Sequence, residues 1–269
     1  MRLSDDITLH YAQGVERDRL TTWGRLEALR TRALLARFLP PAPAVVLDVG
    51  GAEGAYAFPL ADEGYQVHLL DPVPGHVEAA RAADRAGALA SAEVGDAREL
   101  PVEDASADAV LLLGPLYHLV EAADRARALA EAHRVLRPGG RLFAAAISRF
   151  ASALDGLRAG VITDPQFEAL VEEDLRTGIH RNPDVARRPE WFTLAYFHRP
   201  DDLLAEVRAV FPGAEVFAVE GPCGQSSMDL DLDDPVARET ALRTIERLER
   251  EPSLLGASPH LLAVARKAA

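Results

Sequence analysis

The stretch VVLDVGGAEG, Val45–Gly54, decides the fold of this chain. Its first three residues are apolar and include β-branched side chains, which predicts a buried strand of a parallel sheet. Gly50, Gly51 and Gly54 follow, and residues without a Cβ let the backbone turn tightly and approach a ligand closely. A short helix is predicted over the next ten residues, AYAFPLADEG. Strand, glycine turn and helix in this order are typical of a nucleotide-like cofactor site at the mouth of a parallel sheet.

The same alternation of strand and helix continues along the chain. Strands are predicted at residues 45–49, 65–71, 92–94, 109–113, 141–147, 214–220 and 260–266. Between and around them, helical periodicity is found at residues 24–39, 76–85, 122–136, 201–210 and 238–250. Residues 1–22 are polar and irregular. This order predicts an α/β fold with a doubly wound, mostly parallel, seven-stranded sheet.

Four segments with different roles are expected. Residues 1–43 would form an N-terminal arm and helix over the cofactor site, 44–148 the cofactor-binding core, and 201–269 the C-terminal part of the core sheet. The alternation breaks at 149–200, which we expect to be a helical lid insertion that binds the substrate. Its aromatic side chains either line the substrate site or form the lid's own core: Trp191, Phe192, Tyr196 and Phe197.

Composition limits the possible partners. The formal net charge is −13 over 269 residues, so a nucleic-acid backbone is a poor partner. The single cysteine, Cys223, forms no internal disulfide or multi-cysteine metal site. The acidic residues 229–234 lack the glycine and spacing of a calcium loop, so no metal is expected. We expect a cytoplasmic protein with no membrane span and, as one option, a homodimer.

The glycine turn does not match the two common phosphate-binding patterns. A dinucleotide site needs G-x-G-x-x-G, and Glu53 would bring a carboxylate toward a pyrophosphate. No Walker phosphate loop is present either. The acids that end the next two strands, Asp71 and Asp96, suit a ribose and an adenine instead. A nucleoside ligand without phosphates therefore fits best, and S-adenosylmethionine is such a ligand.

Five elements, in order, resemble class I S-adenosylmethionine-dependent methyltransferases of the bacterial small-molecule type. They are DVGGAEG at Asp48–Gly54, the acid Asp71, GDA at Gly95–Ala97, GPL at Gly114–Leu116 and LRPGGRL at Leu136–Leu142. The resemblance covers residues 44–147 and implies the Rossmann-like methyltransferase fold with S-adenosylmethionine as cofactor and S-adenosylhomocysteine as product. One departure is Ala52, which stands at the family's middle glycine and narrows the approach to the methionine part.

The resemblance also implies roles for individual residues. Gly50, Gly51, Ala52 and Gly54 would shape the turn under the methionine part, and Asp48 would orient that turn or the ligand's ammonium. Asp71 would hold the ribose hydroxyls, with Pro72 and Val73 beside the adenine and Asp96 and Ala97 at its edge. Gly114, Pro115 and Leu116 would line the methyl-transfer mouth. The rival interpretation of Asp71 and Asp96 is that they cap loops.

Methyl transfer is an in-line displacement, so holding the reactants close and aligned supplies most of the acceleration. A base is needed only when the acceptor must lose a proton. His118 is the first candidate base, His198 the second, and Tyr117 lies beside the first; each histidine could instead be structural.

The N-terminal arm supplies two further candidates for the cofactor site. Tyr11 could close over the cofactor, and Arg25 could meet its carboxylate unless it lies on a solvated helix face. Two rival functions stay open: a non-catalytic protein of this fold that binds or activates a partner, and an RNA or protein methyltransferase.

Overall fold

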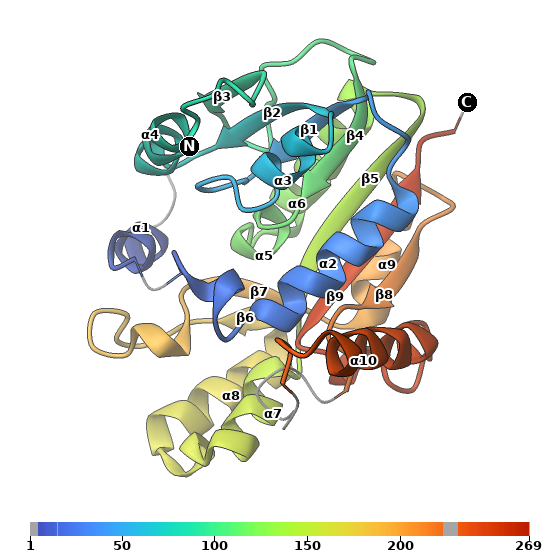
Figure 1. Cartoon of the computed structure of the whole chain (residues 1–269). Coiled ribbons are helices and arrows are strands. Elements are labelled where there is room, and N and C mark those ends of the chain that lie inside the picture. The colour runs from blue at the N-terminus through green and yellow to red at the C-terminus, as the bar shows by residue number, and fades with distance from the viewer. Residues whose placement is uncertain (1–4, 15, 223–230, 269) are drawn as a thin grey trace. The chain divides into compact units, whose positions relative to one another are not determined.

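The computed structural model describes residues 5–14, 16–222 and 231–268 (Figure 1). The chain forms two compact units, which we describe separately. Unit 1 takes the residues up to Leu34, then Ala146–Leu203 and Val216–Leu262. Unit 2 takes Leu35–Ala145, Leu204–Glu215 and the residues from Ala263 onward. Cys223 and the first two residues of the acidic stretch 229–234 lie outside the described residues.

Unit 2 is built on a parallel sheet. Its strands follow the order β3-β2-β1-β4-β5, which Figure 1 shows side by side. Their bounds are β1 Val45–Val49, β2 Gln66–Asp71, β3 Ser91–Val94, β4 Ala107–Leu112 and β5 Leu136–Ser148. Val46 of the central strand pairs with Val67 on one side and with Ala109 on the other, and all three are fully buried. Helices cover both faces of such a sheet, which is why its strands are continuously apolar.

The helices of unit 2 follow the strands in the predicted order. They are α3 Ala57–Asp62, α4 Pro74–Ala83, the short α5 Pro115–His118 and α6 Ala122–Val135, with the end of α9 Pro200–Arg208. The end of β9 (His260–Arg266) adds an antiparallel partner to β5, because Gly139 N donates to Lys267 O and Lys267 N donates to Gly140 O. Because the strands are parallel, their carboxyl ends meet at one edge of the sheet, where α/β proteins bind ligands.

Unit 1 is largely helical, and its described residues include two small apolar cores. Its helices are α1 Asp5–Ala12, most of α2 Arg25–Phe38, α7 Ala151–Ala159, α8 Pro165–Thr177 and α10 Pro235–Leu248; its strands are β6 Ile179–His180, β7 Ala195–His198 and most of β8 Glu215–Ala218. One core joins Phe167, Leu170, Val171 and Trp191, and the other joins Leu26, Leu232 and Ile245. Within the described residues, no helix is long and apolar enough to cross a membrane.

The predicted fold class is confirmed, with corrections in detail. The described residues form nine strands rather than seven, because β6 and β7 lie inside the segment predicted to be a helical lid. These strands have two and four residues, too few to show a period in the sequence. β7 pairs in parallel with the end of β5, where Ile147 faces Phe197, and in antiparallel with β6. The segment predicted to be irregular at the N-terminus contains α1.

Candidate functional site

The turn after β1 depends on left-handed backbone at three residues. Gly50, Ala52 and Gly54 have φ values of +75°, +48° and +95°. A methyl group on Gly50 would lie 2.8 Å from Cδ of Pro115, so the turn reaches closely to the start of α5. Ala52 takes the same unfavourable region with a Cβ, which costs an L-residue about 1–2 kcal/mol. The middle position of this turn therefore favours glycine, and this chain carries an alanine there.

Asp48, at the end of β1, is a buried carboxyl group with unused hydrogen-bonding capacity. Its exposed fraction is 1%, and neither carboxyl oxygen has a hydrogen-bond partner among the described residues. Burial, together with the charge of Asp71, raises the pKa of Asp48 to about 7. The group lies directly beneath the turn, because a Cβ on Gly51 would meet Asp48 Oδ2 at 2.7 Å. A buried carboxyl group without a partner is costly unless a ligand supplies one.

Asp71, at the end of β2, holds two loops in place. Its Oδ2 accepts a hydrogen bond from Ala52 N at 2.9 Å, while Oδ1 accepts from Val73 N at 2.9 Å and contacts His76 Nδ1 at 3.0 Å. This is the loop-capping role that the sequence left open. A carboxylate has about four lone-pair sites, and these three contacts occupy two on Oδ1 and one on Oδ2. One site on Oδ2 is left for a ligand hydroxyl.

Asp96, after β3, is paired with Arg98. Its oxygens accept hydrogen bonds from the Arg98 backbone N and Nε, both at 2.9 Å, and from Arg98 Nη2 at 2.5 Å. Arg98 also donates to Asp124 at 2.8 Å. Burial would raise the pKa of Asp96, but the hydrogen bonds and charge of Arg98 hold that pKa below its ordinary value. Asp96 therefore stays ionised.

The turn after β4 adjoins the glycine turn. A Cβ on Gly114 would lie 3.5 Å from the carbonyl oxygen of Gly50 and 3.6 Å from the Tyr117 hydroxyl. That hydroxyl donates to the Leu113 carbonyl at 3.1 Å. The ring of Tyr117 packs edge-on against His118 at 4.8 Å. Leu116 is fully buried, whereas His118 is partly exposed. Unit 2 thus brings the turns after β1 and β4 together.

The remaining predicted residues belong to unit 1. Arg25 forms an ion pair with Asp233 at 2.7 Å and donates to the Leu232 carbonyl at 3.2 Å. Tyr11 packs edge-on against His10 at 5.5 Å. His198 is fully buried on β7, with its ring 4.7 Å from that of Tyr196. Their roles at the cofactor or the acceptor stay predictions, as do those of the residues in unit 2.

The four aromatic residues predicted in the lid have different surroundings. Trp191 packs against Phe167 at 5.2 Å inside a buried core, and the ring of Phe197 stacks on His180 at 4.5 Å. Tyr196 accepts a hydrogen bond from Arg149 at 3.0 Å. Phe192 has a φ of +67°, which is rare for a bulky residue, and its ring lies 5.2 Å from that of His10. Trp191 and Phe197 are therefore buried residues of unit 1, whereas Phe192 and Tyr196 are partly exposed.

Sequence reasoning missed the partners of the predicted acids. Arg98 follows Asp96 by two residues and His76 follows Asp71 by five, so this short spacing was the available signal. A buried pair in unit 1 was also missed: Asp174 Oδ2 and His180 Nδ1 lie 2.9 Å apart, and the two residues are six apart in sequence, on helix α8 and strand β6.

Known proteins resemble this chain in sequence. Residues 47–144 match the family described as "Methyltransferase domain". A demethylmenaquinone methyltransferase of Deinococcus radiodurans is 39% identical over 187 residues, which cover 66% of this chain and 76% of that protein. The chain belongs to the class I S-adenosylmethionine-dependent methyltransferases. An uncharacterized methyltransferase of Mycobacterium bovis is 43% identical over 105 residues, 39% of this methyltransferase and only 40% of the relative's own length.

The fold agrees with this assignment. A solved structure of an S-adenosylmethionine-dependent methyltransferase from Thermotoga maritima matches over 97% of this methyltransferase and 98% of that chain, with a TM-score of 0.59 at 18% identity. At that identity the likeness concerns the fold alone.

The cofactor of this methyltransferase is S-adenosylmethionine, and the residues of unit 2 suit it. Asp48 offers a buried carboxyl group without a partner among the described residues beneath the turn, where the cofactor's ammonium would supply the missing donors. Asp71 keeps one lone-pair site for a ribose hydroxyl.

Proposed function

We propose that this methyltransferase acts on a small-molecule acceptor. The main support is the similarity to the Deinococcus protein, whose name gives a quinone as its acceptor. This similarity covers 187 residues and so extends beyond residues 47–144, which match the methyltransferase family model. The net charge of −13 adds support, since it disfavours a polyanionic substrate such as RNA.

In this proposal, three residues of unit 2 hold the cofactor. Asp48 binds its ammonium, Asp71 binds a ribose hydroxyl and keeps the turn at Ala52 in place, and Asp96 faces the adenine amino group. When bound, the cofactor supplies an electrophilic methyl group on a sulfonium. Asp48 then gains the donors that its buried oxygens lack, which is the observation that carries the assignment.

In this proposal, most of the rate acceleration comes from holding the acceptor atom close to the methyl group and in line with the bond that breaks. An acceptor with a phenol or hydroxyl group must also lose a proton, and the imidazole of His118 is suited to take it because that side chain is only partly buried. His198 is fully buried, which makes it the weaker candidate.

A methyl-transfer screen tests the proposal. The purified chain is incubated with S-adenosylmethionine labelled in its methyl group and with separate sets of quinols, phenols, amines, RNA and protein. We expect label in one of the small-molecule sets, with S-adenosylhomocysteine formed in equal amount. Label in RNA or protein alone would instead favour the rival enzyme classes.

Titration calorimetry with S-adenosylhomocysteine separates an enzyme from a non-catalytic protein of the same fold. Binding is expected in wild type and should be much weaker in Asp48→Asn. No heat at high ligand concentration would contradict the proposal.

A further inference from the structure

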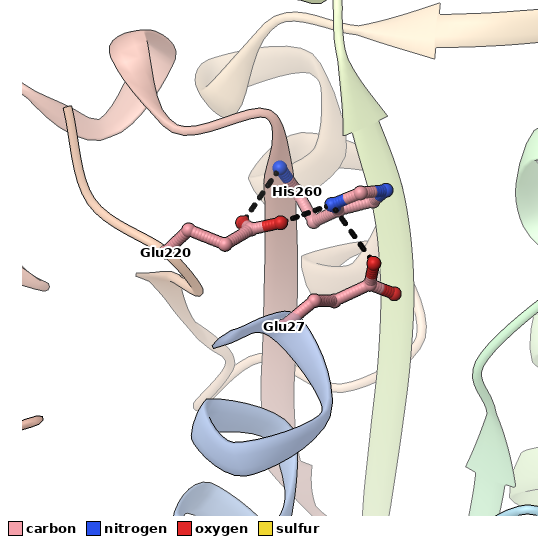
Figure 2. Close-up of side chains that lie close together, drawn as sticks. All are labelled: Glu27, Glu220 and His260. Atoms are coloured by element: carbon pink, nitrogen blue, oxygen red, sulfur yellow. Dashed lines mark hydrogen bonds and ion pairs between the residues drawn. The ribbon is translucent and has the colours of Figure 1, made fainter. Parts of the chain in front are cut away.

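Unit 1 contains a group of three side chains that share the donor chemistry of a metal site. Glu27 comes from the first turn of α2, Glu220 follows β8, and His260 begins β9. One ligand atom from each lies within 4.8 Å of the other two. Figure 2 shows both carboxyl groups pointing toward the same ring nitrogen of His260. This nitrogen, Nδ1, lies 2.5 Å from Glu220 Oε1 and 3.5 Å from Glu27 Oε2. Three segments far apart in the sequence thus meet here.

The separations suit a small divalent cation. Bonds of about 2.0–2.2 Å to nitrogen and oxygen place neighbouring ligand atoms of a tetrahedral site about 3.4 Å apart. The distances from Nδ1 lie on either side of this value. The shorter contact is a hydrogen bond between His260 Nδ1 and Glu220 Oε1, so an ion bound here would replace that hydrogen bond.

Neighbouring residues already orient both carboxyl groups. Glu220 Oε2 accepts hydrogen bonds from Ser258 Oγ and from His260 N, each at 3.2 Å. The guanidinium of Arg19 donates to both oxygens of Glu27. Outer partners of this kind fix the ligands of metal sites and tune their basicity.

The group is rich in negative charge. Glu27 and Glu220 face His260, and Arg19 pairs with both Glu27 and Glu16, which contacts His10. With both histidines neutral, the groups named here carry three negative charges and one positive charge. A proton on His260 removes half of this excess negative charge, whereas a divalent cation removes all of it. A half-compensated group is costly here, because Glu220 is only 4% exposed.

We propose that Glu27, Glu220 and His260 form a zinc site that links α2, the end of β8 and the start of β9. One imidazole and two carboxylates are ligands of the kind that zinc takes in proteins, and water would complete four-fold coordination. Mg²⁺ fits less well, because it prefers oxygen ligands alone. The site would stabilise unit 1 and takes no part in methyl transfer.

The test uses the full chain stripped of metal, with Zn²⁺ for affinity and Co²⁺ as a spectroscopic probe. We expect one ion per chain, a higher melting temperature with Zn²⁺ than with chelator or Mg²⁺, and the visible bands of tetrahedral Co²⁺. Glu27→Gln and His260→Gln should each weaken Zn²⁺ binding at least tenfold. Glu239→Gln, an exposed glutamate on α10 that pairs with Arg243, serves as the matched control and should bind like wild type.

Two results would overturn the proposal even if a variant failed to fold. The first is wild-type protein with no stoichiometric Zn²⁺ binding and no melting shift. The second is a thiolate-to-Co²⁺ charge-transfer band, which would place the ion on Cys223. X-ray absorption of the wild-type zinc complex gives an independent check, since the proposal requires one imidazole and otherwise oxygen ligands.

Discussion

The backbone N of Ala52 donates a hydrogen bond of 2.9 Å to Asp71 Oδ2. This bond ties the turn after β1 to the acid that ends β2. It also holds Ala52 at a φ of +48°, where an alanine is strained. The carboxylate expected to bind the ribose thus also holds the backbone of the turn after β1.

Asp71→Ala should weaken S-adenosylhomocysteine binding by about tenfold or more, because a charge-assisted hydrogen bond to the ribose is lost. Since the turn also loses its anchor, binding alone does not separate the two effects. We therefore expect wild type to discriminate against an analogue that lacks the 2′-hydroxyl and the variant to bind both ligands equally, by calorimetry. A variant that still discriminates would assign Asp71 a positioning role only.

Ala52→Gly should raise the free energy of unfolding by about 1 kcal/mol or less. Glycine removes the cost of the left-handed backbone, about 1–2 kcal/mol, which stabilises the folded state. It also increases the conformational entropy of the unfolded chain, which destabilises the folded state by about 0.4–1 kcal/mol. Chemical denaturation measures the change. Ala61→Gly, within helix α3, is the control and should destabilise by about 0.5–1 kcal/mol. Equal destabilisation by both variants would contradict the strain at Ala52.

Cofactor binding should strengthen as pH rises through 7. Burial raises the pKa of Asp48 to about 7, so the free protein holds a proton there below that pH. A bound ammonium favours the ionised form, so binding releases the proton and affinity rises by up to about tenfold per unit below the pKa. Calorimetry in buffers of different ionisation enthalpy measures the release. Asp48→Asn should abolish it, and an unchanged release would exclude Asp48 as its source.

The same group should make the ligand-free protein less stable as pH rises from about 4 to 7. The folded pKa of Asp48 is raised above its unfolded value of about 3.9, so the native state binds more protons over this window. Asp48→Asn should therefore raise the melting temperature more at pH 8 than at pH 4. A gain equal at both pH values would indicate a packing effect instead.

His118→Ala should lower kcat by about 100-fold or more with a phenolic or hydroxyl acceptor, the effect of losing a general base. Cofactor affinity should not change. His68→Ala is the control, since His68 lies on β2 and contacts Ser91. Turnover equal to wild type in the His118 variant would leave proximity, or His198, as the source of catalysis.

The sequence alone predicted the core of the fold. Continuous apolar strands followed by Gly50, Asp71, Asp96 and Gly114 indicate a parallel sheet whose loops meet at one edge, and local periodicity is enough to place them. The strands β6 and β7 were not predicted, because they are stabilised by pairing with residues distant in sequence. Phe197 of β7, for example, pairs with Ile147 of β5.

The partners of the predicted residues were decided by tertiary structure. Composition cannot tell that Asp48 has no hydrogen-bond partner among the described residues while Asp71 has three donors around it. Glu27, Glu220 and His260 lie up to 233 residues apart in sequence and show no motif. Spacing along the chain encodes only local geometry, so groups that the fold assembles from distant segments become visible only once the helices and strands are in place.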